Sequence, residues 1–298
     1  MKTNILKSVF FSALAGTMLF TSCSDDDSNG GGTEQSGDRW ITVAGALMQD
    51  APGDGNGGTK IYAVNVDNAK DENYSINVYQ NGEPVLSNRT ARLQASEDGN
   101  TVFNIAYTGD NGGTFSKYIV NGGRSFVQTG SQVDISDYAG TSPRWAKLFD
   151  GDRTGVAVNV TSPQVTQIEG IYGYTRGTAT VLSLDLQNPR ITEVKQFEIP
   201  LTPEEEALGH HLFRLDSPIL NATGNKLIIG MWMRKTNPLT GGNESGFERI
   251  GSKSLVVDYP SLENPQVITS TVGFGDTTGY RSFNGYVAHD NNIYQATQ

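Results

Sequence analysis

Apolar and polar residues alternate along short segments of this chain, and glycine, asparagine and aspartate separate the segments. The segments are rich in Val, Ile, Thr and Tyr, which is the pattern of strands buried on one face. The strands predicted in this way cover residues 101–108, 115–121, 155–161, 178–185, 193–199, 226–233, 254–259 and 266–271. Only residues 202–209 have the signals of a helix, with Thr202 as the N-cap, Pro203 after it and Gly209 at the end. The sequence therefore predicts an all-β protein.

The predicted strands form a weak internal repeat with four strands in each unit. The units cover residues 92–130, 144–199 and 214–272, and residues 40–48, 60–66 and 74–79 fit strands two to four of an earlier unit. A repeat of about 50 to 70 residues with several strands is typical of β-propeller blades. The segment from Arg281 fits only the start of a further unit. We expect residues 39–298 to form a β-propeller of four-stranded antiparallel blades, as an incomplete ring from a truncated chain.

An arginine stands at the start of the first strand of each unit. These arginines are spaced 52, 70 and 67 residues apart and are Arg92, Arg144, Arg214 and Arg281. Equivalent points of successive blades converge on the axis of a propeller, so the four guanidinium groups are expected to line a site for an anion. The alternative is that each arginine pairs with a carboxylate of a neighbouring blade. The carboxylates in reach of such pairing are Glu97, Asp150, Asp216 and Asp290.

Long loops are expected on the same face as these arginines. They join the second and third strands of their units and cover residues 49–58, 162–177 and 235–251. Long loops in a compact fold are more often functional than merely connecting. Their ligand-binding candidates are Tyr172, Tyr174, Arg176 and Arg249, with Phe247 beside the last. Trp145 and Trp232 are expected to pack in the core or between sheets.

Charge and motifs exclude several functions. The net charge of −10 and the pI of about 4.8 argue against nucleic acid or an anionic lipid surface as a partner. The chain has no HExxH, Gly-x-Ser-x-Gly or phosphate-loop motif. His210 and His211 are adjacent, and adjacent residues of a strand point to opposite faces. We therefore expect no metal, no cofactor and no enzyme, although carboxylates brought together by folding would allow a hydrolase or lyase.

Residues 1–22 have the features of a bacterial lipoprotein signal peptide. Lys2 and Lys7 form a short basic segment before an apolar stretch, residues 8–19. This stretch is too short to span a membrane as a mature helix. Small residues then lead into Cys23, the only cysteine of the 298 residues. This junction resembles a lipobox, whose cysteine is acylated; an ordinary signal peptide with an incidental cysteine is the alternative. Residues 23–38, acidic and then glycine-rich, predict a flexible tether of roughly 20 Å.

The lipobox, the acidic residues 24–27 and the repeat together resemble Bacteroidetes surface lipoproteins that are built on β-propellers. The resemblance implies a lipid-anchored protein of the outer membrane, exposed at the cell surface, with a TonB-dependent transporter as its partner. The xenosiderophore-binding lipoproteins of this kind imply capture of a ferric siderophore, a small anionic ligand that the arginines would suit. A glycan-binding lipoprotein of a polysaccharide-uptake system and a propeller hydrolase or lyase are the alternatives.

Overall fold

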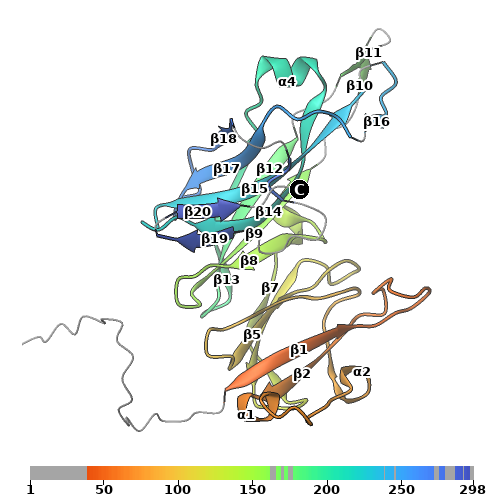
Figure 1. Ribbon diagram of the computed structural model, residues 1–298, viewed down its shortest axis with the longest axis vertical. Coiled ribbons are helices and arrows are strands. Elements are labelled where there is room, and N and C mark those ends of the chain that lie inside the picture. Colours follow the sequence, from red (N-terminus) through yellow and green to blue (C-terminus); the bar gives the residue numbers. More distant parts are fainter. Residues whose placement is uncertain are drawn as a thin grey trace, which may run out of the picture. The chain divides into compact units, whose positions relative to one another are not determined.

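The computed structural model describes residues 39–161, 166–168, 171–173, 177–237, 239–244, 246–271, 275–278, 286–290 and 292–295. Four antiparallel sheets follow one another along this part of the chain, and Figure 1 shows them in colours from orange to blue. They are the blades of a β-propeller, so the fold class predicted from the sequence is confirmed. The predicted signal peptide, Cys23 and the tether lie outside the described residues.

The first two sheets contain three and four strands. The first has the order β1 (Trp40–Ala46), β2 (Thr59–Asn65), β3 (Glu83–Val85). The second has the order β4 (Arg92–Ala95), β5 (Thr101–Ile105), β6 (Thr114–Val120), β7 (Phe126–Asp134). Each strand of the second sheet pairs with the next strand of the chain, so this blade is a meander that ends four residues beyond the predicted unit.

The third and fourth sheets follow the same plan with longer strands. The third has the order β8 (Arg144–Lys147), β9 (Thr154–Thr161), β12 (Thr178–Asp185), β13 (Arg190–Glu198), and the hairpin β10 (Thr166–Ile168)–β11 (Ile171–Gly173) is inserted between β9 and β12. The fourth has the order β14 (His210–Leu220), β15 (Lys226–Thr236), β17 (Ser252–Asp258), β18 (Gln266–Ser270), with β16 (Asn243–Glu244) paired to β15. A last hairpin consists of β19 (Tyr286–His289) and β20 (Asn292–Gln295).

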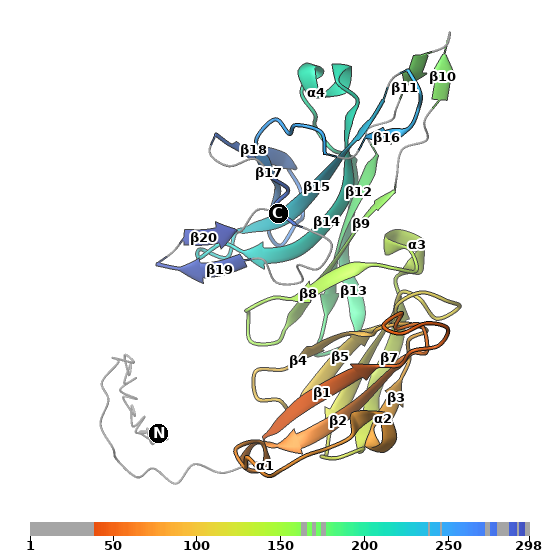
Figure 2. The same ribbon diagram turned by 45° about the vertical axis from the view of Figure 1, so that its right-hand side comes forward.

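Three hydrophobic cores hold successive sheets together. The smallest joins Ala63 of β2 to Val102 of β5. The next contains Phe103 and Phe115 of the second sheet and Leu182 of the third, and the largest joins the third sheet to the fourth. The first strands are neighbours across the blades: β14 contacts β8 and β8 contacts β4, and Figure 2 shows them one after another. The starts of these strands therefore lie close together at the inner edge of the blades.

Two details of the sequence prediction are wrong. Residues 74–79 do not form a strand, because the Asn77 side chain accepts hydrogen bonds from the N–H groups of Tyr79 and Gln80 and begins helix α2 (Val78–Asn81). The third strand of that sheet is β3. The prediction that only residues 202–209 form a helix is also wrong. Besides α4 (Pro203–Ala207), the described residues contain α1 (Val66–Ala69), α2 and α3 (Ser136–Ala139). None of these helices has the length and apolar character needed to cross a membrane.

Helix α4 joins the third sheet to the fourth and is fixed by a buried ion pair. The predicted N-cap is confirmed: Thr202 and Glu205 form a capping box. Glu205 is only 2% exposed, and its Oε1 lies 2.9 Å from Nζ of Lys253 in β17. One carboxylate thus caps the helix and pairs with a strand of the following blade.

Acid is expected to destabilise this part of the fold through two histidines. His210 and His211 begin β14, and burial lowers the pKa of each imidazole below its ordinary value. The folded protein therefore resists protonation that the unfolded chain accepts below about pH 6.5, so stability should fall as the pH drops through that range. Urea unfolding at several pH values from 7.5 to 5 tests this. In the double variant His210→Gln, His211→Gln, the free energy of unfolding should fall less steeply as the pH drops. An equally steep fall in the variant and in the unchanged protein would show that these histidines do not cause the acid sensitivity.

Candidate functional site

Three of the predicted arginines occupy comparable positions on the inner strands. Arg92 and Arg144 are the first residues of β4 and β8 and lie opposite Ile105 and Val158. Arg214 is the fifth residue of β14 and lies opposite Trp232. In each sheet, the loop between the second and third strands leaves from the same end. The arginines and these loops therefore share one face of the propeller. Arg281 lies outside the described residues.

The three arginines gather around one buried carboxylate, that of Asp216 in β14. Asp216 is 2% exposed, and its Oδ2 lies 3.4 Å from Nε of Arg144. The charges of Arg92 and Arg214 also act on this carboxylate. The pair Arg144–Asp216 joins two neighbouring blades, so the bridging role considered as the alternative is realised for Arg144. Three guanidinium groups thus lie near enough to this one carboxylate for their charges to act on it, and one of them, that of Arg144, pairs with it.

A tyrosine completes this group, which we call the arginine cluster: Arg92, Arg144, Arg214, Asp216 and Tyr107. Tyr107 follows β5, and the guanidinium carbon of Arg92 lies 4.3 Å from the centre of its ring. Arg92 and Tyr107 also share a side-chain hydrogen bond. Exposed Arg89 lies 5.9 Å from the same ring. The cluster thus contains a phenol, whose proton can be given up or taken back, beside its cations.

The environment shifts the pKa values of the cluster. Burial raises the pKa of the Asp216 carboxyl, although the charges of Arg144, Arg92 and Arg214 oppose this effect. Burial, with neighbouring Arg144, lowers the pKa of Arg214 to about 10, so this guanidinium stays charged at neutral pH. Burial would raise the pKa of Tyr107, but the hydrogen bond from Arg92 and the charges of Arg92 and Arg144 outweigh it and lower the pKa. The pKa of the Asp216 carboxyl and the pKa of the Tyr107 phenol are thus both shifted toward neutral pH, as in acid–base sites.

Two aromatic side chains of the fourth sheet, Phe213 and Trp232, border the cluster, and we call them the aromatic wall. The guanidinium carbon of Arg214 lies 4.7 Å from the centre of the Trp232 ring, and Phe213 meets Trp232 edge-to-face at 5.2 Å. Trp232 is half-buried, so of the two predicted places, in the core or between sheets, it is not in the fully buried core. Trp145 is buried as predicted, and its Nε1 donates to the backbone carbonyl of Arg92 at 2.7 Å. That bond holds the start of β4 against β8.

Arg249, another predicted site residue, pairs outside the cluster. Arg249 stacks on Phe247, with its guanidinium carbon 4.5 Å from the ring centre, and its Nη2 lies 2.6 Å from Oδ2 of Asp276. Since Asp276 also accepts the N–H of Met233, Arg249 fastens a buried segment to β15. Tyr172 lies in β11, and Tyr174 and Arg176 lie outside the described residues. Their part in ligand binding stays a prediction.

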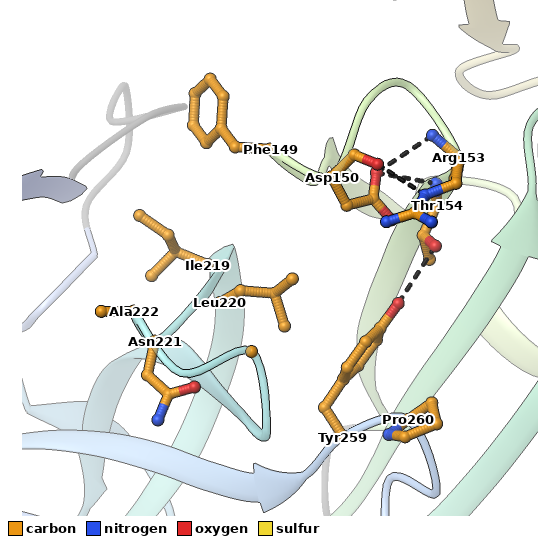
Figure 3. A pocket seen from close by; sticks show the side chains of 11 residues that line it. Phe149, Asp150, Arg153, Thr154, Ile219, Leu220, Asn221, Ala222, Tyr259 and Pro260 are labelled. Carbon is orange, nitrogen blue, oxygen red and sulfur yellow. Dashed lines mark hydrogen bonds between the residues drawn. The ribbon is translucent and has the colours of Figure 1, made fainter. Parts of the chain in front are cut away.

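A cavity of about 980 Å³ lies at the other end of the same strands. Figure 3 shows Phe149 after β8, Ile219 and Leu220 at the end of β14, and Tyr259 beyond β17. Its charged side chains bind backbone groups of one turn: the Nε of Arg153 donates to the backbone carbonyl of Asp150 at 2.6 Å, and the Asp150 carboxylate accepts the backbone N–H of Arg153. Tyr259 hydrogen-bonds to Thr154 at 3.0 Å. This cavity is mainly apolar and offers fewer reactive groups than the arginine cluster.

The sequence prediction misses one member of the cluster, Tyr107, and two of its neighbours, Arg89 and Phe213. For Tyr107 a signal exists. It stands two residues beyond Ile105, the partner of Arg92, so alternation places both side chains on one face of the sheet. For Phe213 the sequence has no signal, because its position depends on a register shift in β14.

The arginine cluster has the groups that ester hydrolysis or proton transfer requires. A buried carboxylate with a raised pKa is a better base than an exposed one, and a phenol with a lowered pKa is a better acid. Guanidinium groups fixed by their neighbours stabilise negative charge on a bound carboxylate, phosphate or developing oxyanion. No group of three metal-ligating side chains occurs among the described residues.

Comparison with known proteins finds similarity only among solved structures. No protein-family model matches the chain, and no curated protein matches it. A Bacteroides uniformis protein, described as a proposed 6-phosphogluconolactonase, is 11% identical over 77% of this chain and 55% of its own, with a TM-score of 0.32. The periplasmic gluconolactonase PpgL of Pseudomonas aeruginosa is 12% identical over 70% of this chain and 51% of its own, with a TM-score of 0.30.

A Bacteroides fragilis protein, also described as a proposed 6-phosphogluconolactonase, is 13% identical over 89% of this chain and 76% of its own, with a TM-score of 0.35. This chain thus spans about half the length of the first two structures. At such identities and TM-scores the likeness transfers no substrate and no residue role to this chain.

The prediction that the chain is not an enzyme is wrong by this comparison. All three similar structures are described as lactonases, which are enzymes, and none is described as a ligand-capture protein. Residues from separate blades, such as Tyr107 and Asp216, form no motif along the chain, so the sequence alone could not bring them together.

Proposed function

We propose that the arginine cluster is the active site of a hydrolase that opens the ester bond of a small anionic substrate, such as an acidic lactone. The observation that carries the proposal is the placement of Arg92, Arg144 and Arg214 near one carboxylate, Asp216, with which Arg144 pairs on the inner strands. The positive charges of these three arginines favour a substrate that has a carboxylate or phosphate of its own. The lactonase descriptions of the similar structures agree with this class but carry no weight in the proposal.

The proposed reaction uses each group of the cluster once. Asp216 takes a proton from the attacking water, and the oxygen of that water forms a bond to the ester carbonyl carbon. The guanidinium groups stabilise the negative charge that develops on the carbonyl oxygen. When the ester C–O bond breaks, Tyr107 gives its proton to the leaving oxygen. Exchange with water returns both groups to their starting states, and the product acid releases one proton.

The test is proton release from lactones of different charge, followed at constant pH. The probes are 6-phosphogluconolactone, glucaro-1,4-lactone, which has a carboxylate, and neutral gluconolactone. We expect the protein to open the two anionic lactones faster than the neutral one, with an advantage that shrinks as salt rises. If none of the three opens faster than in buffer alone, the proposal is wrong.

Removing one guanidinium sharpens this test. Arg92→Gln keeps the backbone carbonyl that Trp145 uses but removes a charge beside Tyr107. Loss of a charge-assisted hydrogen bond predicts a fall in kcat/KM of about 10- to 100-fold for the anionic lactones. The control is Arg124→Gln, which removes an exposed arginine paired with Glu83 at 3.0 Å in the first sheet. An equal effect of both variants would contradict the assignment.

Three inferences about the whole protein remain predictions of the sequence. They are the lipid anchor at Cys23, exposure at the surface of the outer membrane, and partnership with a TonB-dependent transporter. They are compatible with a surface enzyme that acts on small molecules near a transporter. The ferric siderophore and the glycan are not carried further as ligands, because no contact of the described residues favours either.

A further inference from the structure

A further guanidinium group, that of Arg234, lies next to the arginine cluster on the aromatic wall. Arg234 of β15 stands two residues after Trp232, so both side chains leave the same face of the strand. Its guanidinium carbon lies 3.2 Å from the centre of the Phe213 ring and 5.9 Å from that of Trp232. Arg214 of the cluster lies on the same two rings, at 5.4 and 4.7 Å. Arg214 and Arg234 therefore both lie against the aromatic wall.

Stacking leaves the hydrogen-bond donors of Arg234 usable. When a guanidinium group lies on an aromatic ring, the ring covers one of its faces, while its N–H bonds point outward in the guanidinium plane. Among the described residues, no carboxylate oxygen lies within 4.0 Å of Arg234 in an ion pair, whereas Arg144 and Arg249 have such partners. Burial lowers the pKa of Arg234, which shows that its charge is partly removed from water. An anion at its edge would offset that loss of solvation.

The separation of the two arginines limits what can bridge them. Both guanidinium carbons are measured from the centre of the Phe213 ring, at 5.4 and 3.2 Å, so they lie no farther apart than the total, about 8.6 Å. Two acidic groups joined by a short carbon chain span such a distance. The ring faces of Phe213 and Trp232 offer that chain an apolar surface.

We propose that Arg234, Phe213 and Trp232 form a second subsite, which binds the far acidic group of a substrate with two acidic groups. The inference rests on the proposed function, since the near acidic group lies in the arginine cluster. It narrows the substrate class from small anions in general to dianions with an apolar middle.

Calorimetric titration of the full chain with dicarboxylates and with monocarboxylates of the same chain length tests the subsite. The probes are the dicarboxylates from succinate to suberate, each compared with the monocarboxylate of the same number of carbons. We expect one or two intermediate lengths of dicarboxylate to bind about 10-fold more tightly than their monocarboxylates. In Arg234→Gln this advantage should disappear, while the affinity for monocarboxylates stays as in the unchanged protein. Arg234→Lys, which keeps the charge without the planar group, should retain part of it.

The control is Arg190→Gln, which removes an exposed arginine paired with Asp185 at 3.2 Å on the third sheet. It should change neither affinity. If monocarboxylates bind but dicarboxylates gain nothing, or if the gain survives Arg234→Gln, the subsite is wrong and the anion site stands. If no acid of either series binds the unchanged protein, both the subsite and the proposed anion site are wrong. Equal urea midpoints for all variants establish that binding changes do not come from unfolding.

Discussion

Replacing Glu205 with alanine is expected to destabilise the fold by about 3–5 kcal/mol. The change leaves the ammonium group of Lys253, 5% exposed, without the carboxylate that lies 2.9 Å away. It also removes the acceptor of the Thr202 N–H, which caps α4. Because α4 leads directly into β14, the loss reaches the strand that holds Arg214 and Asp216. Urea unfolding measures the effect.

Two further variants separate the ion pair from the helix itself. Glu204→Ala, at the neighbouring exposed position of α4, should change the free energy of unfolding by less than about 0.5 kcal/mol. The double variant Glu205→Leu, Lys253→Met replaces both charges with apolar groups and should recover part of the lost stability, since no buried charge is left unpaired. A Glu205→Ala effect as small as that of Glu204→Ala would mean that the pair contributes nothing.

The strands could be predicted from the sequence because alternation reports burial directly. Residues 178–185 form β12 with the predicted bounds, and the repeat placed Arg92 and Arg144 at the starts of their strands. The third strand of the first sheet was missed for a local reason. Residues 74–79 alternate as a strand does, but the capping hydrogen bonds of Asn77 start a helix there. Side-chain capping competed with the strand pattern and prevailed.

The candidate site could be predicted only in part, because its members come from three blades. The repeat identifies Arg92, Arg144 and Arg214 as equivalent, so their convergence follows from the fold. It offers Asp216 only as one of four carboxylates in reach of the arginines and does not select it, since pairing across blades depends on how the sheets pack. It also cannot place Arg234 against Phe213, because the shift in β14 register appears only in the folded strand pair.

Replacing Asp216 with asparagine is expected to lower kcat for an anionic lactone by about 10²–10⁴-fold, the usual contribution of a general base. Asparagine has the size of aspartate and can still accept the N–H of Ser217, which donates to Oδ1 at 2.9 Å. It cannot take a proton from water. The matched control is Asp110→Asn, an exposed residue in the loop between β5 and β6, which should leave kcat unchanged.

The pH profile distinguishes a base from a residue that merely holds Arg144 in place. Asp216 must be ionised to act, and burial raises its pKa, so activity should rise with pH through a midpoint above the ordinary value of 3.8. Tyr107 must be protonated to act, and its pKa is lowered, so activity should fall again through a midpoint below 10. In Asp216→Asn the acidic limb should vanish, and in Tyr107→Phe the alkaline limb should vanish. An acidic limb that persists in Asp216→Asn would leave Asp216 only the task of fixing Arg144, and the proton acceptor would have to be another group.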